Sequence, residues 1–252
     1  MVGTDRSLDA EGAASLAFRT KGGPLVGVAA LCGGAGASSL ALLTAVAAAR
    51  SSKAPVLACD TGGASGGLAC YANAESRYSL AAASARLAAG ARVSRDELFA
   101  LSSHGLRVLA AGPEADVAGD PGVVTRLLRD ARNAHGLTLV DCGTLASPIQ
   151  RHALEHATHV LWILPATVSG VRRAERVLQI VPCYLPGREA VVARHDAGER
   201  TPPMRQLASL ADDRGGPLVL MPHIPDLAEA AHEDALDAAD IALHAIGAVL
   251  HR

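Results

Sequence analysis

Aromatic residues are scarce in this chain of 252 residues, because phenylalanine, tyrosine and tryptophan together make up only 2% of it. Proteins that bind single-stranded nucleic acid usually stack the bases on aromatic rings, so this scarcity argues against that function. The formal net charge is −2 at pH 7, which gives the chain no basic footprint for a nucleic-acid backbone. We therefore do not expect nucleic acid as a partner.

Long apolar runs and paired cysteine motifs are absent as well. No apolar run reaches the roughly 18 residues of a membrane-spanning helix, so we expect no stable membrane insertion. The five cysteines show no C-x-x-C spacing, and three of them lie in or beside apolar, strand-like runs, which indicates thiols in a reducing compartment. Residues 1–23 are largely polar and carry no secretory signal, so we predict a flexible N-terminal tail and a cytoplasmic protein.

What the chain does contain is a regular alternation of strand and helix signals after residue 23, in a sequence that is 50% hydrophobic. This alternation is typical of a parallel sheet covered by helices. We therefore predict a single α/β domain over residues 24–252, with a doubly wound, mainly parallel sheet and helices on both faces. The expected strands are 24–31, 54–59, 106–110, 137–140, 159–164, 189–193 and 218–220. The expected helices are 39–50, 80–89, 94–101, 123–134, 168–181 and 234–250.

A glycine-rich stretch, Cys-Gly-Gly-Ala-Gly-Ala-Ser-Ser at 32–39, separates the first expected strand from the first helix. Strand, glycine turn and helix in this order form a phosphate site, because backbone N–H groups turn inward and the helix N-terminus adds partial positive charge. A P-loop also needs a lysine directly before the hydroxyl residue, and Ala37 stands there. The residues expected to hold the phosphate are Gly33, Gly34, Ala35, Gly36, Ala37, Ser38 and Ser39.

Lysine is too rare to replace the missing charge. The two lysines, Lys21 and Lys53, precede the first and second expected strands, at the edge of the sheet opposite the loop. Losing one charge-assisted phosphate contact costs roughly 1.5–3 kcal/mol, or about ten- to a hundredfold in affinity. We therefore expect phosphate to bind weakly.

Two acidic residues directly follow expected strands, Asp60 after strand 54–59 and Asp141 after strand 137–140. The carboxyl ends of parallel strands meet at one edge of the sheet, where ligands bind. Asp60, Asp141 and Ser38 are therefore candidate ligands of one Mg²⁺ ion, which prefers a few oxygen ligands and water. Either aspartate alone is equally well explained as a cap of the following turn.

The glycine stretch resembles the loop of the ParA/MinD group of deviant P-loop ATPases, K-G-G-x-G-K-[ST]-[ST]. It matches the three glycines and both hydroxyls, but Cys32 and Ala37 replace the two lysines. The resemblance implies that the first lysine would have crossed a nucleotide-sandwich dimer and the second would have held ATP or ADP with Mg²⁺. It also places Asp60 as the first acid of the family's D-x-D, Gly62 where the water-activating acid belongs, and Asp141 as the Walker B acid.

Within that group the chain more closely resembles the CpaE/TadZ branch, the localisation proteins of pilus assembly. Segments 66–71 (Gly-Gly-Leu-Ala-Cys-Tyr), 105–112 (Gly-Leu-Arg-Val-Leu-Ala-Ala-Gly) and Ile224-Pro225 follow in family order, whereas Ala193-Arg194 replaces the Asn-Arg that contacts adenine. The resemblance implies a degenerate positioning or scaffold protein with weak or absent ATP hydrolysis. Its expected partners are proteins of a pilus, secretion or division machine and a second copy of itself, with recruitment to the inner face of the membrane by those partners. A residual Mg²⁺-dependent ATPase in partition or cell division is the alternative.

Two patterns keep other enzyme classes open. Gly34 to Ser39 followed by Asp60 imitates the dinucleotide fingerprint of NAD(P)-binding Rossmann enzymes, although Ser39 fits poorly where a third glycine is usual. His152, Glu155 and His156 spell H-x-x-E-H, a zinc pattern of metalloproteases. Glu229 or Glu233 would have to supply the third zinc ligand, and a solvated polar helix face explains the pattern equally well.

Two surfaces keep further binding roles open. Helix 234–250 has apolar residues around most of its circumference, but its first half is acidic, so packing in the core is favoured over a membrane or partner surface. Arg172, Arg173 and Arg176 form a small basic face that could contact DNA weakly, although such clusters are usually only solvated.

Overall fold

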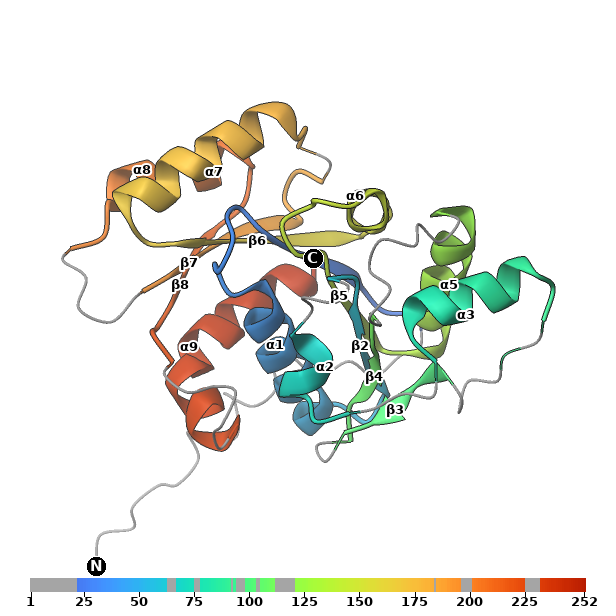
Figure 1. Cartoon of the computed structure of the whole chain (residues 1–252). Coiled ribbons are helices and arrows are strands. Elements are labelled where there is room, and N and C mark those ends of the chain that lie inside the picture. Colours follow the sequence, from blue (N-terminus) through green and yellow to red (C-terminus); the bar gives the residue numbers. More distant parts are fainter. Residues whose placement is uncertain are drawn as a thin grey trace, which may run out of the picture.

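The computed structural model describes residues 22–62, 67–74, 78–91, 93, 98–102, 105–111, 121–183, 185–195, 201–224 and 232–252. Over these residues the strands form one eight-stranded sheet in the order β3-β4-β2-β5-β1-β6-β7-β8 (Figure 1). The pair β3–β4 is antiparallel and the other pairs are parallel. The prediction of a doubly wound, mainly parallel sheet is therefore confirmed.

The strands and helices alternate along most of the chain. The strands are β1 (Leu25–Ala30), β2 (Val56–Asp60), β3 (Ala100–Leu101), β4 (Arg107–Leu109), β5 (Leu137–Asp141), β6 (His159–Pro165), β7 (Glu189–Arg194) and β8 (Leu218–Met221). The helices are α1 (Ala37–Ser51), α2 (Leu68–Tyr71), α3 (Leu80–Ala88), α5 (Pro121–Ala134), α6 (Pro148–Glu155), α7 (Val168–Ile180), α8 (Met204–Asp213) and α9 (His232–Leu250).

Strand order separates this fold from the nicotinamide-binding one. Here β5 lies between β1 and β2 and pairs with both. In the Rossmann order 3-2-1-4-5-6 the first two strands are direct neighbours. The dinucleotide interpretation of the glycine loop is therefore wrong.

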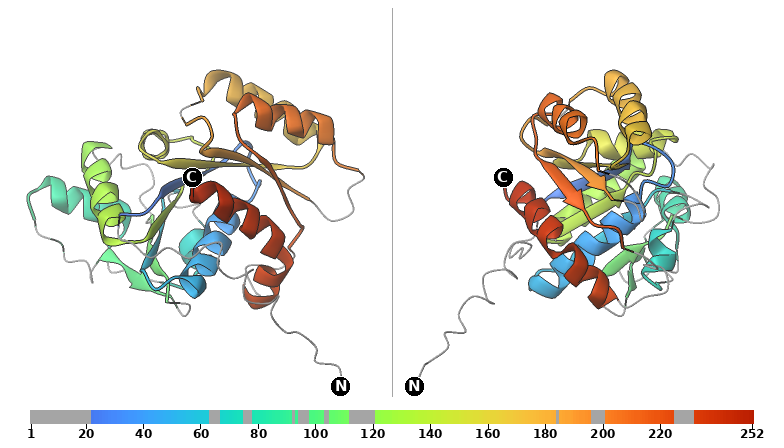
Figure 2. Two further views of the ribbon diagram at one scale, coloured as in Figure 1. Left: turned by 180° about the vertical axis from the view of Figure 1, so that it is seen from behind. Right: turned by 90° about the vertical axis from the view of Figure 1, so that its left-hand side faces the viewer.

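The helices form two layers, one on each face of the sheet. Buried side chains of α1, α2 and α9 share one apolar cluster, and those of α3, α5, α6, α7 and α8 share the other. Figure 2 shows α1 and α9 side by side on one face and α7 with α8 on the opposite face. Because α9 and α2 cover α1, the alanine- and leucine-rich α1 can be apolar on most of its sides.

The last helix packs into the core, as favoured from the sequence. Ala239 and Ile246 are fully buried, whereas Ile241 on the outer side is 86% exposed. Among the helices that the structure describes, none combines the length and the apolar character needed to cross a membrane.

Two features depart from the expected elements. A helix was expected over 94–101, but Ala100 and Leu101 form the edge strand β3, which pairs with β4 across a turn at Gly105. Residues 94–97 of that expected helix lie outside the described part of the chain. The helices α8, between β7 and β8, and α2, between β2 and α3, were not expected.

The domain begins slightly before residue 24. The Gly22 N–H donates to the carbonyls of Arg132 and His135, both at 3.0 Å, and the Gly23 carbonyl accepts from Arg132 Nε at 2.8 Å. A Cβ on Gly23 would lie 1.5 Å from the Gly136 carbonyl oxygen, so no larger residue fits without a shift. Residues 1–21 of the predicted tail lie outside the described residues.

Candidate functional site

The glycine loop runs from the end of β1 into the first turn of α1. Gly34 has φ 73° and Gly36 has φ 103°, conformations that residues with a Cβ rarely adopt. A Cβ at Gly33 or Gly34 would meet no atom within 4 Å, so the outer side of this loop faces open space. The glycines therefore hold a turn that leaves its backbone accessible.

The N-terminus of α1 is left without a side-chain cap. Gly36 occupies the N-cap position and offers no side chain to the first turn. Leu40 N donates to the Gly36 carbonyl at 2.9 Å, so the N–H groups of Ala37, Ser38 and Ser39 have no partner within the helix. Such a terminus attracts anions.

A cleft of about 690 Å³ opens beside this terminus, at the carboxyl ends of the parallel strands. Of the residues predicted to hold phosphate, Gly34 to Ser39 line the cleft and Gly33 does not. The other lining residues are Ala30, Thr61, Gly62, Tyr71, Asp141, Gly143, Thr144, Ala146, Ser147, Pro148, Ile149, Gln150 and Arg194.

The structure brings the three predicted magnesium ligands together. Ser38 Oγ donates a hydrogen bond to Asp141 Oδ2, whose other oxygen accepts from Gly143 N at 3.0 Å. Asp60 stands directly opposite Asp141 in the β2–β5 pair, and its Oδ1 accepts from Gly62 N at 2.7 Å. Ser38 and Asp141 line the cleft, whereas Asp60 does not.

Both carboxyl groups are buried, and this changes their acidity. Burial, and next the adjacent Asp141 carboxylate, raise the pKa of Asp60 to about 6. Burial also raises the pKa of Asp141, opposed by the hydrogen bond from Ser38. Two adjacent buried carboxylates with a hydroxyl provide the oxygen ligands that Mg²⁺ prefers, so the residues present fit such an ion.

The cationic side chains expected of a P-loop are missing from the loop itself. Ala37, at the position of the phosphate-binding lysine, is only 6% exposed, and Cys32 is half-buried. Lys53 is exposed in the turn before β2 and does not line the cleft, while Lys21 lies outside the described residues. The backbone of an anion site is thus present with little positive charge around it.

One cationic residue at the loop was missed by sequence reasoning. Arg194, at the end of β7, lines the cleft, and its Nη1 donates to the Gly34 carbonyl at 3.0 Å. The same nitrogen lies 3.1 Å from where a Cβ on Gly36 would be. The signal in the sequence is an arginine directly after a buried strand, at the place where the resemblance implies an adenine contact.

A polar network also supports the far wall of the cleft. Thr61 Oγ1 donates to the Asp141 carbonyl at 2.5 Å, and Gln150 Nε2 donates to the Thr61 carbonyl at 3.2 Å. Gln150 belongs to the first turn of α6, where it forms a capping box with Ser147. The loops after β2 and β5 are thereby tied to α6.

The remaining sequence candidates lie away from the cleft. His152, Glu155 and His156 lie close together at the end of α6, while Glu229 and the side chain of Glu233 fall outside the described residues. Arg172, Arg173 and Arg176 are exposed on α7, so a solvated face accounts for them.

Comparison with protein-family models found no match, and comparison with curated proteins found none either. Solved structures do match. A ParA family ATPase from Chlorobium tepidum is 19% identical with a TM-score of 0.67, over 91% of this chain and 96% of that one. An ATP complex of McdA from Cyanothece is 15% identical with a TM-score of 0.71, over 92% and 97%. The MinC:MinD cell division complex of Aquifex aeolicus contains a chain that is 18% identical with a TM-score of 0.65. That match covers 91% of this chain and 95% of the other.

These likenesses extend over nearly the whole chain and agree with the strand order. The chain therefore has the P-loop fold of the ParA and MinD ATPases.

Proposed function

We propose that this chain is a degenerate ParA/MinD-like protein of the CpaE/TadZ type, which positions or scaffolds other proteins and hydrolyses ATP weakly or not at all. The observation that carries the proposal is a glycine loop with an open, uncapped α1 terminus in which the lysine position is a buried alanine, Ala37. Gly62 in place of the second acid adds to it, because a water molecule then lacks the carboxylate that would activate it.

Weak nucleotide binding follows from the charges in the cleft. The phosphates of ATP or ADP would meet the N–H groups of Ala37, Ser38 and Ser39, and Mg²⁺ would meet Ser38 and Asp141, with Asp60 opposite Asp141. Without the lysine, binding loses roughly 1.5–3 kcal/mol. This chain then acts mainly through contacts with proteins of a pilus, secretion or division machine and with a second copy of itself. The MinC:MinD complex, formed by a protein of the same fold, supports protein partners.

The experiment that tests this proposal restores the lysine. We expect titration calorimetry to show weak binding of ATP·Mg²⁺ to the native chain, and Ala37→Lys to tighten it by about ten- to a hundredfold. Ala37→Met is the matched control, because it adds similar bulk without charge and should not tighten binding. A phosphate-release assay on the native chain should show little or no turnover.

A second candidate function, a residual Mg²⁺-dependent ATPase in partition or division, is favoured by Arg194. Its guanidinium lies at the glycine loop and supplies positive charge from β7 rather than from the loop. Turnover in the native chain that Arg194→Gln abolishes would support this candidate. Turnover at the rate of an ordinary ATPase would overturn the scaffold proposal.

A further inference from the structure

The last turn of α6 carries a cluster that the proposed function does not use. His152, Glu155 and His156 each offer one ligand atom within 4.8 Å of the other two, and none of them lines the cleft. We propose that these three side chains bind a divalent transition-metal ion, with Zn²⁺ the best match, at a surface site separate from the nucleotide cleft.

Hydrogen bonding determines which ring nitrogen of the first histidine is a donor. The single hydroxyl proton of Thr125 is donated to the Pro121 carbonyl at 3.0 Å. The 2.5 Å contact between Thr125 Oγ1 and His152 Nε2 therefore requires Nε2 to be the donor. In the neutral ring Nδ1 then carries a lone pair, and it faces Glu155 Oε2 at 3.6 Å. Two acceptors in this arrangement repel each other unless a cation lies between them.

The second histidine is also held by one ring nitrogen, in this case Nδ1. His156 Nδ1 lies 2.9 Å from the His152 carbonyl, so it donates and leaves the Nε2 lone pair available. The two imidazole rings are adjacent, with centroids 4.4 Å apart. Both histidines thus keep one nitrogen for a metal while the other is engaged with the protein.

The donor set matches zinc chemistry. Two imidazoles and a carboxylate suit Zn²⁺, with water in the remaining position. With bonds of about 2.0–2.1 Å, neighbouring donors of a tetrahedral site lie about 3.3 Å apart, and the His152–Glu155 pair at 3.6 Å is close to that spacing. The side chains of Glu155 and His156 are exposed, so they can rotate to shorten the remaining donor–donor distances. Thr125 acts as the outer partner that a metal-binding histidine usually has.

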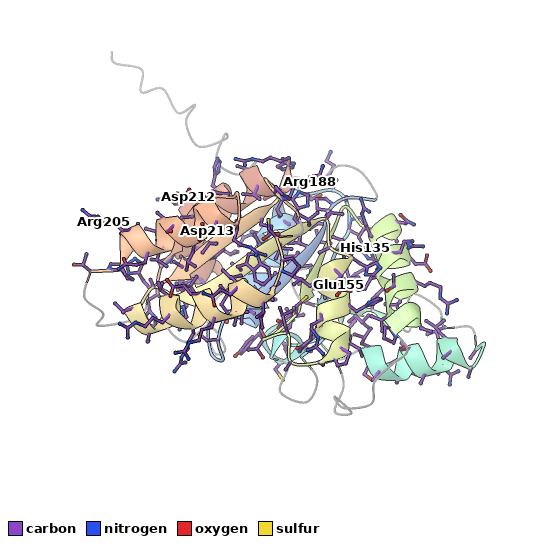
Figure 3. All side chains as sticks on the ribbon, turned by 90° about the horizontal axis from the view of Figure 1, so that it is seen from above. His135, Glu155, Arg188, Arg205, Asp212 and Asp213 are labelled. Atoms are coloured by element: carbon purple, nitrogen blue, oxygen red, sulfur yellow. The ribbon has the colours of Figure 1, made fainter. Side chains whose placement is uncertain are left out.

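The site lies where two helices meet. Figure 3 labels Glu155 at the end of α6 that packs beside α5, the helix that carries Thr125. A bound ion would therefore be held by the end of α6 and linked to α5 only through the contact of His152 with Thr125. An ion pair between protonated His152 and Glu155 is the competing explanation, and it gives His156 no role.

Calorimetric titration of Zn²⁺ into the full chain tests the site. We expect one ion per chain, and binding at least about 100-fold weaker in His152→Ala, His156→Ala and Glu155→Gln. The matched controls are exposed residues of the same type on other helices, His244→Ala on α9 and Glu175→Gln on α7, and they should bind like the native chain. Co²⁺ bound at the site should show no thiolate charge-transfer absorption, which separates it from binding by the five cysteines.

Variants of Thr125 test the orientation of His152 without touching a ligand. Thr125→Val should weaken Zn²⁺ by about 10- to 100-fold, and Thr125→Ser, which keeps the hydroxyl, should restore it. The proposal is overturned if the native chain binds no Zn²⁺, if His156→Ala binds it unchanged, or if Co²⁺ shows thiolate ligation.

Discussion

Two aspartates on neighbouring strands determine the charge of the cleft. Asp60 and Asp141 stand opposite each other and are each only 1% exposed. Because burial and then repulsion by Asp141 raise the pKa of Asp60 to about 6, the folded chain loses this proton only as the pH rises through about 6. Above that pH the ionised pair destabilises the fold when no cation offsets it.

We therefore predict that replacing Asp60 increases the free energy of unfolding, by an amount that depends on pH. The folded-state pKa of about 6 exceeds the ordinary 3.8, so the contribution of this proton to stability is complete below the lower value and lost as the pH rises through 6. In Asp60→Asn that loss cannot occur. We expect urea unfolding without divalent ions to show that the free energy of unfolding of the variant, relative to that of the native chain, rises by on the order of 2–3 kcal/mol between about pH 4 and pH 8. An equal difference at every pH, or an equal gain in exposed Asp237→Asn, would count against this cause.

At the scale of single residues, the sequence predicted that Asp60 and Asp141 belong to the site, but it did not predict Arg194. Ser38, Asp60 and Asp141 each follow or end an apolar strand or its loop, so a parallel sheet places all three at the same edge. Arg194 reaches the glycine loop only because β7 lies one strand beyond β6, the neighbour of β1. That placement depends on the order of strands, which sequence spacing does not determine.

At the scale of elements, one buried ion pair holds several of them together. Glu189, at the start of β7, accepts from Arg214 Nε at 2.8 Å and from Trp162 Nε1 of β6 at 2.7 Å. Arg214, directly after α8, also donates to the carbonyls of Val181 and Pro182, which follow α7. The two outer helices are thereby anchored to the sheet through a single carboxylate.

Removing this charge should be costly. We expect Glu189→Gln to lower the free energy of unfolding by about 3–5 kcal/mol, because the Arg214 guanidinium stays buried without its anion. Glu175→Gln, on the exposed side of α7, is the control and should change stability by no more than about 0.5 kcal/mol. Thermal or urea unfolding followed by circular dichroism measures both, and a loss below about 1 kcal/mol for Glu189→Gln would contradict the anchoring role.

The central parallel strands could be predicted because they are apolar runs that are buried on both faces, as in β1. The edge strand β3 could not, because Leu101 is 71% exposed and is held by pairing with β4 rather than by burial. In α8 the buried residues are Leu207, Leu210 and Ala211, which have regular helical spacing but extend over little more than one turn.

At the scale of the whole molecule, the chain enters the domain through a backbone clamp on α5. Deleting residues 1–21 should change stability by no more than about 0.5 kcal/mol if the predicted tail is flexible. Deleting residues 1–23 should cost about 1–3 kcal/mol, because the hydrogen bonds of Gly22 and Gly23 to Arg132 and His135 are lost as well. Unfolding of the two shortened chains measures the difference, and equal stabilities would show that the clamp contributes nothing.

The position of β5 between β1 and β2 means that the backbone, rather than the side chains of the loop, determines the geometry of the site. The backbone of the sheet sets the spacing of Asp60 from Asp141, and the turn at Gly34 and Gly36 sets the start of α1, so neither depends on the replaced side chains. Substitutions at positions 32, 37 and 62 can therefore be made one at a time, and the effect of each new group on nucleotide binding can be measured in the same fold.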